Sequence, residues 1–154
     1  MNPPEIRTAR PADARAIVHI LEHFSGKGLL LPRPLKEVTA RIRDFMVATR
    51  DGSVEGLVAL HPVGEDLAEI RSLAVAEGCQ GGGWGTALVA KTLEDARAMG
   101  FRKVFALTYR VAFFERMGFH PVDKRTLPQK IWSDCVHCAK FTDCDETAVI
   151  LDLR

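Results

Sequence analysis

The glycine-rich segment at residues 73–86 constrains the fold more than any other part of the chain. It follows the strand-like stretch Leu67–Val75 and leads into Trp84–Met99, where apolar residues recur at helical spacing up to Gly100. A second apolar strand is predicted at Lys103–Thr108. A strand, a helix and a second strand of these lengths fit a right-handed parallel crossover. The sequence therefore predicts an α/β unit built around a parallel pair of strands.

The remaining elements follow from apolar spacing and turn-forming residues. Further strands are predicted at Glu5–Thr8, 46–49, 54–61, 148–153 and from Phe119, and further helices from Pro11, at 112–117, and over Leu35, Val38, Ile42 and Phe45. Asp51-Gly52 is a strong hairpin signal, so the two strands beside it are expected to be antiparallel. Simple alternation places Leu67, Glu69, Arg71 and Leu73 on one strand face and Ala68, Ile70, Ser72 and Ala74 on the other. The fold class predicted for residues 1–154 is one α/β (α+β) domain, with a mixed sheet and helices on both faces.

Composition argues against several classes of protein. Lys and Arg total 21 and Asp and Glu total 20, so the net charge of +1 lacks the basic excess of a general nucleic-acid binder. The chain is 47% hydrophobic, as ordinary globular domains are. It contains no apolar run of about 18 residues that could span a membrane. Because the N-terminal residues soon become charged, we expect no signal peptide and a cytoplasmic protein.

The 4 cysteines are too few for a disulfide-based scaffold of this length. Cys79 stands alone, whereas Cys135, Cys138 and Cys144 cluster near the C-terminus with His137. Three thiols and an imidazole suit zinc chemically, but His137 directly precedes Cys138 and a second close cysteine pair is missing. A redox role also stays open. We expect reduced structural thiols and predict no metal.

The glycine-rich segment has a pattern suited to phosphate, because the N–H groups at a helix start lack partners and the helix dipole is positive there. A Walker loop requires lysine after its last glycine, but Gly85 is followed by Thr86. The dinucleotide pattern, counted from Gly81, requires a glycine where Thr86 stands. The pattern that fits is Gln-x-x-Gly-x-Gly, at Gln80, Gly83 and Gly85.

This pattern and a second one resemble the Gcn5-related N-acetyltransferase (GNAT) superfamily. Its motif for the pyrophosphate of acyl-CoA is Gln/Arg-x-x-Gly-x-Gly/Ala after a strand ending like Leu73-Ala74-Val75, and its second signature resembles residues 113–119. The resemblance implies the GNAT fold, with a mixed, mostly antiparallel central sheet, and acetyl-CoA as cosubstrate. It assigns acetyl-CoA binding to Leu73, Ala74, Val75, Gln80, Gly81, Gly82, Gly83, Trp84, Gly85, Thr86 and Phe114. It also implies that the strand ending at Val75 splays from its neighbour and pairs with the pantetheine arm, with an N–H near Leu73 or Ala74 facing the thioester carbonyl.

A narrower resemblance is to the acetyltransferase domain of bacterial N-acetylglutamate synthases, including short members without an amino-acid kinase domain. It rests on residues 28–33, 69–75, 105–108, 127–128 and the C-terminal cysteine segment. It implies acetyl transfer to the α-amino group of glutamate or a related amino acid, the first step of arginine biosynthesis. In this resemblance, Glu69 matches the general base, Thr108 the acid for the leaving thiolate, and Arg33 the residue that holds the substrate carboxylate. Arg71 and Ser72 are further candidates for substrate binding.

Each assigned role has a plainer alternative. Arg33 and Arg71 could be solvated charges, Glu69 the partner of a neighbouring cation, and Thr108 the end of a strand. Phe114 stands where many members of the superfamily have a tyrosine that acts as general acid. The proton for the leaving thiolate would then come from Thr108, Tyr109 or water.

Two other functions stay open, namely acetyl transfer to another small amine and a non-catalytic acyl-CoA sensor. A sensor needs neither a base nor a carboxylate clamp, so Glu69 and Arg33 favour an enzyme. The expected partners are a small-molecule amino acid and, as one option, a second copy of the chain in a homodimer. We expect neither nucleic acid nor a membrane as a partner.

Overall fold

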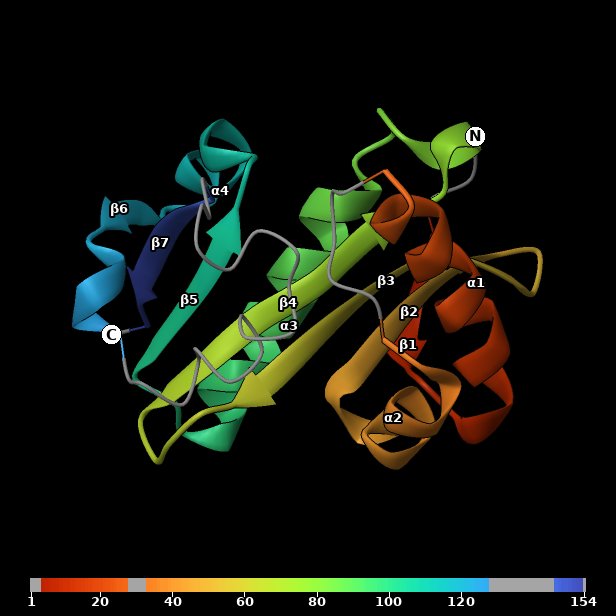
Figure 1. Ribbon diagram of the computed structural model, residues 1–154, viewed down its shortest axis with the longest axis horizontal. Coiled ribbons are helices and arrows are strands. Elements are labelled where there is room, and N and C mark those ends of the chain that lie inside the picture. The colour runs from red at the N-terminus through yellow and green to blue at the C-terminus, as the bar shows by residue number, and fades with distance from the viewer. Residues whose placement is uncertain (1–3, 28–32, 128–145, 154) are drawn as a thin grey trace.

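A seven-stranded sheet forms the centre of the protein in a computed structural model that describes residues 4–27, 33–127 and 146–153. The strands are β1 (Glu5–Thr8), β2 (Phe45–Arg50), β3 (Ser53–Pro62), β4 (Leu67–Val75), β5 (Lys103–Thr108), β6 (His120–Val122) and β7 (Thr147–Asp152). Their order across the sheet is β1-β2-β3-β4-β5-β7-β6. Every neighbouring pair is antiparallel except β4 and β5 (Figure 1). The predicted mixed, mostly antiparallel sheet is confirmed.

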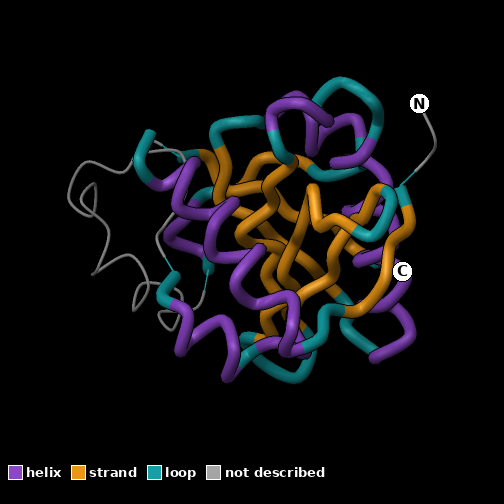
Figure 2. Tube along the Cα trace, turned by 90° about the vertical axis from the view of Figure 1, so that its right-hand side faces the viewer, coloured by secondary structure: helices purple, strands orange, loops and turns teal. Residues whose placement is uncertain are grey.

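Helices cover both faces of the sheet, as predicted. On one face, α1 (Ala14–Ser25) and α2 (Leu35–Ala40) bury apolar side chains against β2 and β3. On the other face, α3 (Trp84–Met99) and α4 (Val111–Arg116) share a larger core cluster with β4, β5 and β7. Figure 2 shows the strands in the interior with helices on either side. Single turns of 3-10 helix lie at Pro11–Asp13, Ile42–Asp44, Glu77–Cys79 and Lys124–Thr126.

Turn residues fix where two of these elements end. Asp51 and Gly52 have φ angles of 52° and 82°, and this pair of left-handed residues makes the tight hairpin turn predicted between β2 and β3. Gly100 ends α3 with a φ of 95°, and its N–H donates to the Arg97 carbonyl at 3.1 Å. A side chain would strain the backbone at Gly52 and Gly100, which explains glycine at both positions.

Strands β4 and β5 pair only at their beginnings. The paired residues are Leu67, Ala68 and Glu69 of β4 with Lys103, Val104 and Phe105 of β5. Figure 1 shows the two strands diverging beyond these residues, so the splay implied by the resemblance is present. From Ile70 onward, the side of β4 that faces β5 has no strand partner in the described part of the chain.

A β-bulge in β4 changes which side chains share a face. In the pairing with β3, two residues of β4, Ser72 and Leu73, lie opposite the single residue Val58. Ser72 adopts a φ of 61° at this point. As a result Leu73 packs on the α3 side of the sheet, whereas Ala74 is buried on the α1 side. The predicted simple alternation is therefore wrong beyond Arg71, because the extra residue reverses the facing of everything that follows it.

The second predicted helix is shorter than its apolar spacing indicated. Leu35, Val38, Ile42 and Phe45 were expected on one helix, but α2 ends at Ala40 and Phe45 is the first residue of β2. Phe45 and Val38 are buried in the same core cluster. The spacing therefore reports burial on a common face rather than a continuous helix.

Some sequence-based expectations fall on residues without a described structure. The cysteine cluster of Cys135, Cys138 and Cys144 with His137 lies outside the described residues, and so do residues 28–32 before Arg33. Within the described ranges, Cys79 is a buried free thiol. None of the helices in those ranges is long and apolar enough to cross a membrane.

Candidate active site

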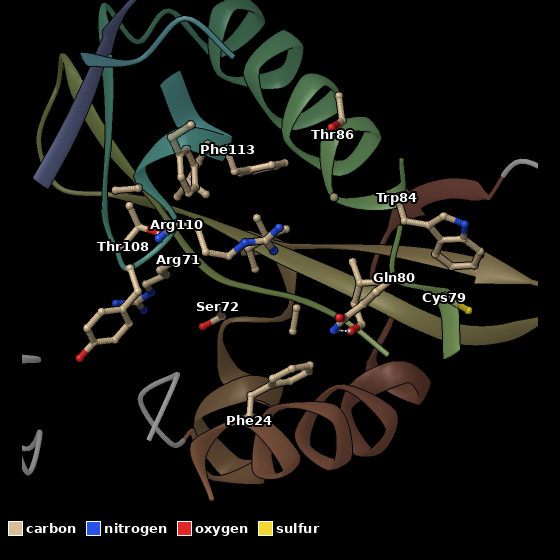
Figure 3. A pocket seen from close by; sticks show the side chains of 18 of the residues that line it. Phe24, Arg71, Ser72, Cys79, Gln80, Trp84, Thr86, Thr108, Arg110 and Phe113 are labelled. Carbon is tan, nitrogen blue, oxygen red and sulfur yellow. Dashed lines mark hydrogen bonds between the residues drawn. The ribbon is translucent and has the colours of Figure 1, made fainter. Parts of the chain in front are cut away.

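A cavity of about 590 Å³ opens where β4 and β5 diverge (Figure 3). Residues 70–75 of β4 form one wall, and the end of β5 together with α4 forms the opposite wall. The first turn of α3 lines one end of it, and Phe24 and Lys27 contribute from the end of α1 and just beyond. The splay of the strands therefore creates the cavity, and the helix that follows β4 begins inside it.

The glycine-rich loop forms the end of the cavity beside α3. Gly81 and Gly83 have φ angles of 83° and 81°, in the left-handed region that favours glycine. Gly83 is the N-cap of α3, and the Ala87 N–H donates to its carbonyl at 3.0 Å. The N–H groups of the three residues before Ala87 have no partner within the helix, because helical bonds reach back four residues. Together with the positive end of the helix dipole, they form an anion-binding surface.

Two side chains hold this loop against the sheet. Gln80 Nε2 donates to the Val75 carbonyl oxygen at 2.9 Å, which closes the loop over the end of β4. Trp84 is 1% exposed, and Figure 3 shows its ring directed away from Thr108 and Arg110 across the cavity. The Trp84 ring is thus a core anchor for α3, and any contact with a ligand falls to its backbone.

The opposite end of the cavity carries an arginine and hydroxyl groups. Figure 3 places Arg71 and Thr108 at this end, away from Gln80 and the start of α3. Thr108 is 8% exposed, and its Oγ1 accepts a hydrogen bond from the Arg110 N–H at 2.8 Å. Because that bond uses a lone pair, the Thr108 hydroxyl keeps its own proton for a second partner.

Most of the residues predicted from the sequence line this cavity. They are Arg71, Ser72, Leu73, Ala74, Val75, Gln80, Gly81, Gly83, Trp84, Gly85, Thr86, Thr108 and Phe114. Glu69, Gly82 and Arg33 are not among the described lining residues. Glu69 is 8% exposed and is the last residue of β4 that pairs with β5, directly before the two strands diverge. The Arg33 side chain is also 8% exposed, and its Nη1 donates to Glu37 Oε1 at 3.3 Å.

A contact at the rim of the cavity was not predicted from the sequence. The Glu77 carboxylate, in the loop before α3, accepts hydrogen bonds from Lys27 Nζ and from His23 Nε2, the latter at 2.9 Å. These two hydrogen bonds lower the pKa of Glu77 to about 2, and the bond from Lys27 has the larger effect. The partners lie 50 and 54 residues from Glu77, so no local pattern could indicate the contact. The contact ties α1 to the loop that leads into α3.

Aromatic rings form the α4 side of the cavity. The Phe114 ring lies edge to face with Phe113 at 5.1 Å and with Phe119 at 5.2 Å between centroids. Phe114 therefore forms part of the cavity wall but has no acidic proton to donate. The hydroxyl groups of the lining residues Thr108 and Tyr109 are candidates for that role. Among the described residues, no group of three or more His, Cys, Asp or Glu side chains could hold a metal ion.

Known acetyltransferases match this chain in sequence. The family model described as the acetyltransferase (GNAT) family matches residues 18–119. An uncharacterised N-acetyltransferase of Chlorobaculum tepidum is 43% identical over 148 residues, which cover 96% of this chain and 96% of that protein. An amino-acid acetyltransferase of Mycobacterium tuberculosis is 34% identical over 134 residues, which cover 85% of this chain and 76% of that protein.

The fold also matches a solved enzyme structure. N-acetylglutamate synthase from Neisseria gonorrhoeae, complexed with coenzyme A and N-acetyl-glutamate, superposes with a TM-score of 0.88 and 26% identity. The superposition covers 100% of this chain and 36% of the gonococcal one. With the splayed strands and the glycine-rich helix start, these matches show that the chain belongs to the GNAT family of acetyltransferases.

Proposed function

We propose that this protein transfers the acetyl group of acetyl-CoA to the α-amino group of glutamate or a closely related amino acid. The observation that carries the proposal is the cavity between β4 and β5, with an anion-binding helix start at one end and Arg71 and Thr108 at the other. The likeness of the whole chain to the gonococcal N-acetylglutamate synthase supports the same class of acceptor. The reaction would be the first step of arginine biosynthesis.

The acetyl-CoA half of the proposal uses the loop and the splayed side of β4. The phosphates lie at the start of α3, where Gly81 and Gly83 allow a close approach to backbone N–H groups. The pantetheine arm runs along β4 beyond Glu69 and pairs with its backbone as an added strand would. The coenzyme A in the gonococcal structure supports this ligand class.

The acceptor half uses the arginines. A guanidinium binds a carboxylate through two parallel hydrogen bonds. Arg71 lines the cavity directly, so we assign the first contact with the amino acid to Arg71, with Ser72 beside it. Arg33 contacts Glu37, so it would reach a substrate carboxylate by sharing or exchanging that contact. We keep Arg33 as the second carboxylate ligand.

The proposed chemistry begins with deprotonation, because only the neutral amine attacks a thioester. Glu69 accepts one proton of the substrate ammonium, directly or through water. The amine nitrogen then bonds to the thioester carbon, and an N–H at the bulge near Leu73 stabilises the resulting oxyanion. The carbonyl re-forms as the C–S bond breaks, and the nitrogen releases its second proton to solvent. The leaving thiolate takes a proton from Thr108, which solvent replaces; a thiol pKa of about 8.5 makes this departure tolerable.

The test is a steady-state assay of thiol release from acetyl-CoA with glutamate, glutamine, aspartate and spermidine as acceptors. We expect glutamate or glutamine to give the highest kcat/KM. Arg71→Ala should raise the KM for the amino acid by roughly tenfold or more, and Arg71→Lys should restore only part of the loss. Arg97→Ala, which removes an arginine from the last turn of α3, is the matched control. It should change neither the KM for the amino acid nor the KM for acetyl-CoA. Spermidine as the best acceptor would contradict the amino-acid assignment.

A further inference from the structure

Arg110, at the junction of β5 and α4, is a cavity-lining cation that the proposed reaction does not use. Its guanidinium carbon lies 5.0 Å from the centroid of the Phe113 ring. Figure 3 shows the side chain extending across the cavity toward the side where Gln80 lies, away from Arg71 and Thr108. The cation is therefore held over an aromatic face and directed toward the glycine-rich loop.

The ring beneath Arg110 also touches the start of α3. A Cβ placed on Gly85 would lie 3.6 Å from Phe113 Cε2 and Cζ, so this ring packs against the first turn of the helix. Gly85 carries one of the N–H groups of the anion-binding surface. The ring thus connects the Arg110 guanidinium to the end of the cavity that is suited to phosphate.

The charge of Arg110 is available to a ligand. Among the described residues, Arg110 forms no salt bridge. Lys27, another cation on the cavity wall, is already paired with Glu77. Arg116 lines the cavity further along α4, but no aromatic ring is stacked on it in the described residues. Arg110 therefore combines an uncompensated charge with a fixed position near the helix start.

We propose that Arg110 binds a phosphate group of acetyl-CoA and that Phe113 holds its guanidinium in place before the ligand arrives. A guanidinium can give a phosphate two parallel hydrogen bonds together with a full positive charge, whereas backbone N–H groups contribute only partial charges. The pyrophosphate and the 3′-phosphate of CoA are both candidate sources of that group. The inference rests on the proposed acetyl-CoA site, and it adds a side-chain ligand to a site otherwise made of backbone.

Calorimetric titrations with shortened ligands test the proposal. The ligands are acetyl-CoA, acetyl-dephospho-CoA and S-acetylpantetheine, which carry all phosphates, the pyrophosphate alone and no phosphate. We expect Arg110→Ala to weaken acetyl-CoA binding by about tenfold or more and to leave the affinity for S-acetylpantetheine unchanged. A matching loss for acetyl-dephospho-CoA assigns the contact to the pyrophosphate, whereas a loss confined to acetyl-CoA assigns it to the 3′-phosphate.

Two further variants separate phosphate binding from other roles. Arg110→Lys should recover part of the acetyl-CoA affinity, and Arg97→Ala, which removes an exposed arginine at the other end of α3, should lose none. Equal losses for all three ligands, or unchanged acetyl-CoA affinity in Arg110→Ala, would overturn the assignment while leaving the acetyl-CoA site in place. Failure of the wild-type protein to bind acetyl-CoA would instead contradict the proposed function and this inference together.

Discussion

Replacing Gly83 with alanine tests whether the backbone geometry of the loop makes the anion site. Gly83 has a φ of 81°, and a Cβ built on it meets no atom within 4 Å. The cost therefore comes from the left-handed backbone alone, which is about 1–2 kcal/mol for a residue with a Cβ. In a chain of this size each kcal/mol lost from the free energy of unfolding lowers Tm by roughly 2–4 °C, so Gly83→Ala should lower Tm by about 2–8 °C.

Gly85→Ala is the matched control, two residues further on. Gly85 lies in the first turn of α3, and its added Cβ would meet the Phe113 ring at 3.6 Å, an ordinary contact. Alanine favours a helix over glycine by up to about 1 kcal/mol. The two alanine variants are therefore expected to shift stability in opposite directions.

Thermal unfolding by circular dichroism without ligand measures the stabilities, and calorimetry with acetyl-CoA measures binding. Gly83→Ala should weaken binding by about tenfold or more, because relief of its strain moves the N–H groups of the loop. Gly85→Ala should bind nearly as well as the wild type, since the family motif accepts alanine at this position. Equal stability of the two variants, or undiminished acetyl-CoA binding by Gly83→Ala, would show that the left-handed backbone at Gly83 does not shape the anion site.

Two further predictions concern carboxylates. Glu69→Gln should lower kcat by about 10²–10⁴-fold with acetyl-CoA affinity unchanged, because the amide keeps the shape of the side chain but cannot accept the proton; a wild-type rate at neutral pH would show that the base lies elsewhere. The pKa of Glu77 is lowered from 4.5 to about 2 by Lys27 and His23, so these contacts stabilise the folded state above pH 4.5 and lose that effect as the pH falls toward 2. In urea unfolding at low salt, the difference in unfolding free energy between wild type and Glu77→Gln should be small, because the Glu77 contacts are exposed. The difference should shrink as the pH falls from 4.5 to about 2. A difference that grows on acidification would contradict this prediction.

Glycines at the ends of elements and runs of apolar residues made much of the region around the cavity predictable. Glycine at the end of α3 and the apolar runs beside it gave β4, α3 and β5 the bounds that the structure has. The anion-binding surface was predictable as well, because it depends on consecutive residues at one helix start. These features were predictable because they depend on interactions between residues close together in the sequence.

Contacts between distant segments could not be predicted in this way. The bulge at Ser72 depends on how β4 pairs with β3, and a single strand carries no signal for it. The burial of Phe45 looked helical because a helix and the strand after it share one core cluster. The rim contact joins Glu77 to His23 and Lys27, which lie 54 and 50 residues away, so it forms only when the chain is folded. Ser72 and Glu77 line the cavity, and all three features are properties of the tertiary structure.

Acetyl transfer to the α-amine of an amino acid can be tested by a competition between acceptors. The wild-type protein is incubated with acetyl-CoA and an equimolar mixture of glutamate, glutamine and spermidine, and the acetylated products are identified and quantified by mass spectrometry. We expect N-acetylglutamate or N-acetylglutamine as the main product, modified at the α-amine. Acetylspermidine as the main product, or no acetylated product while acetyl-CoA is bound, would contradict it.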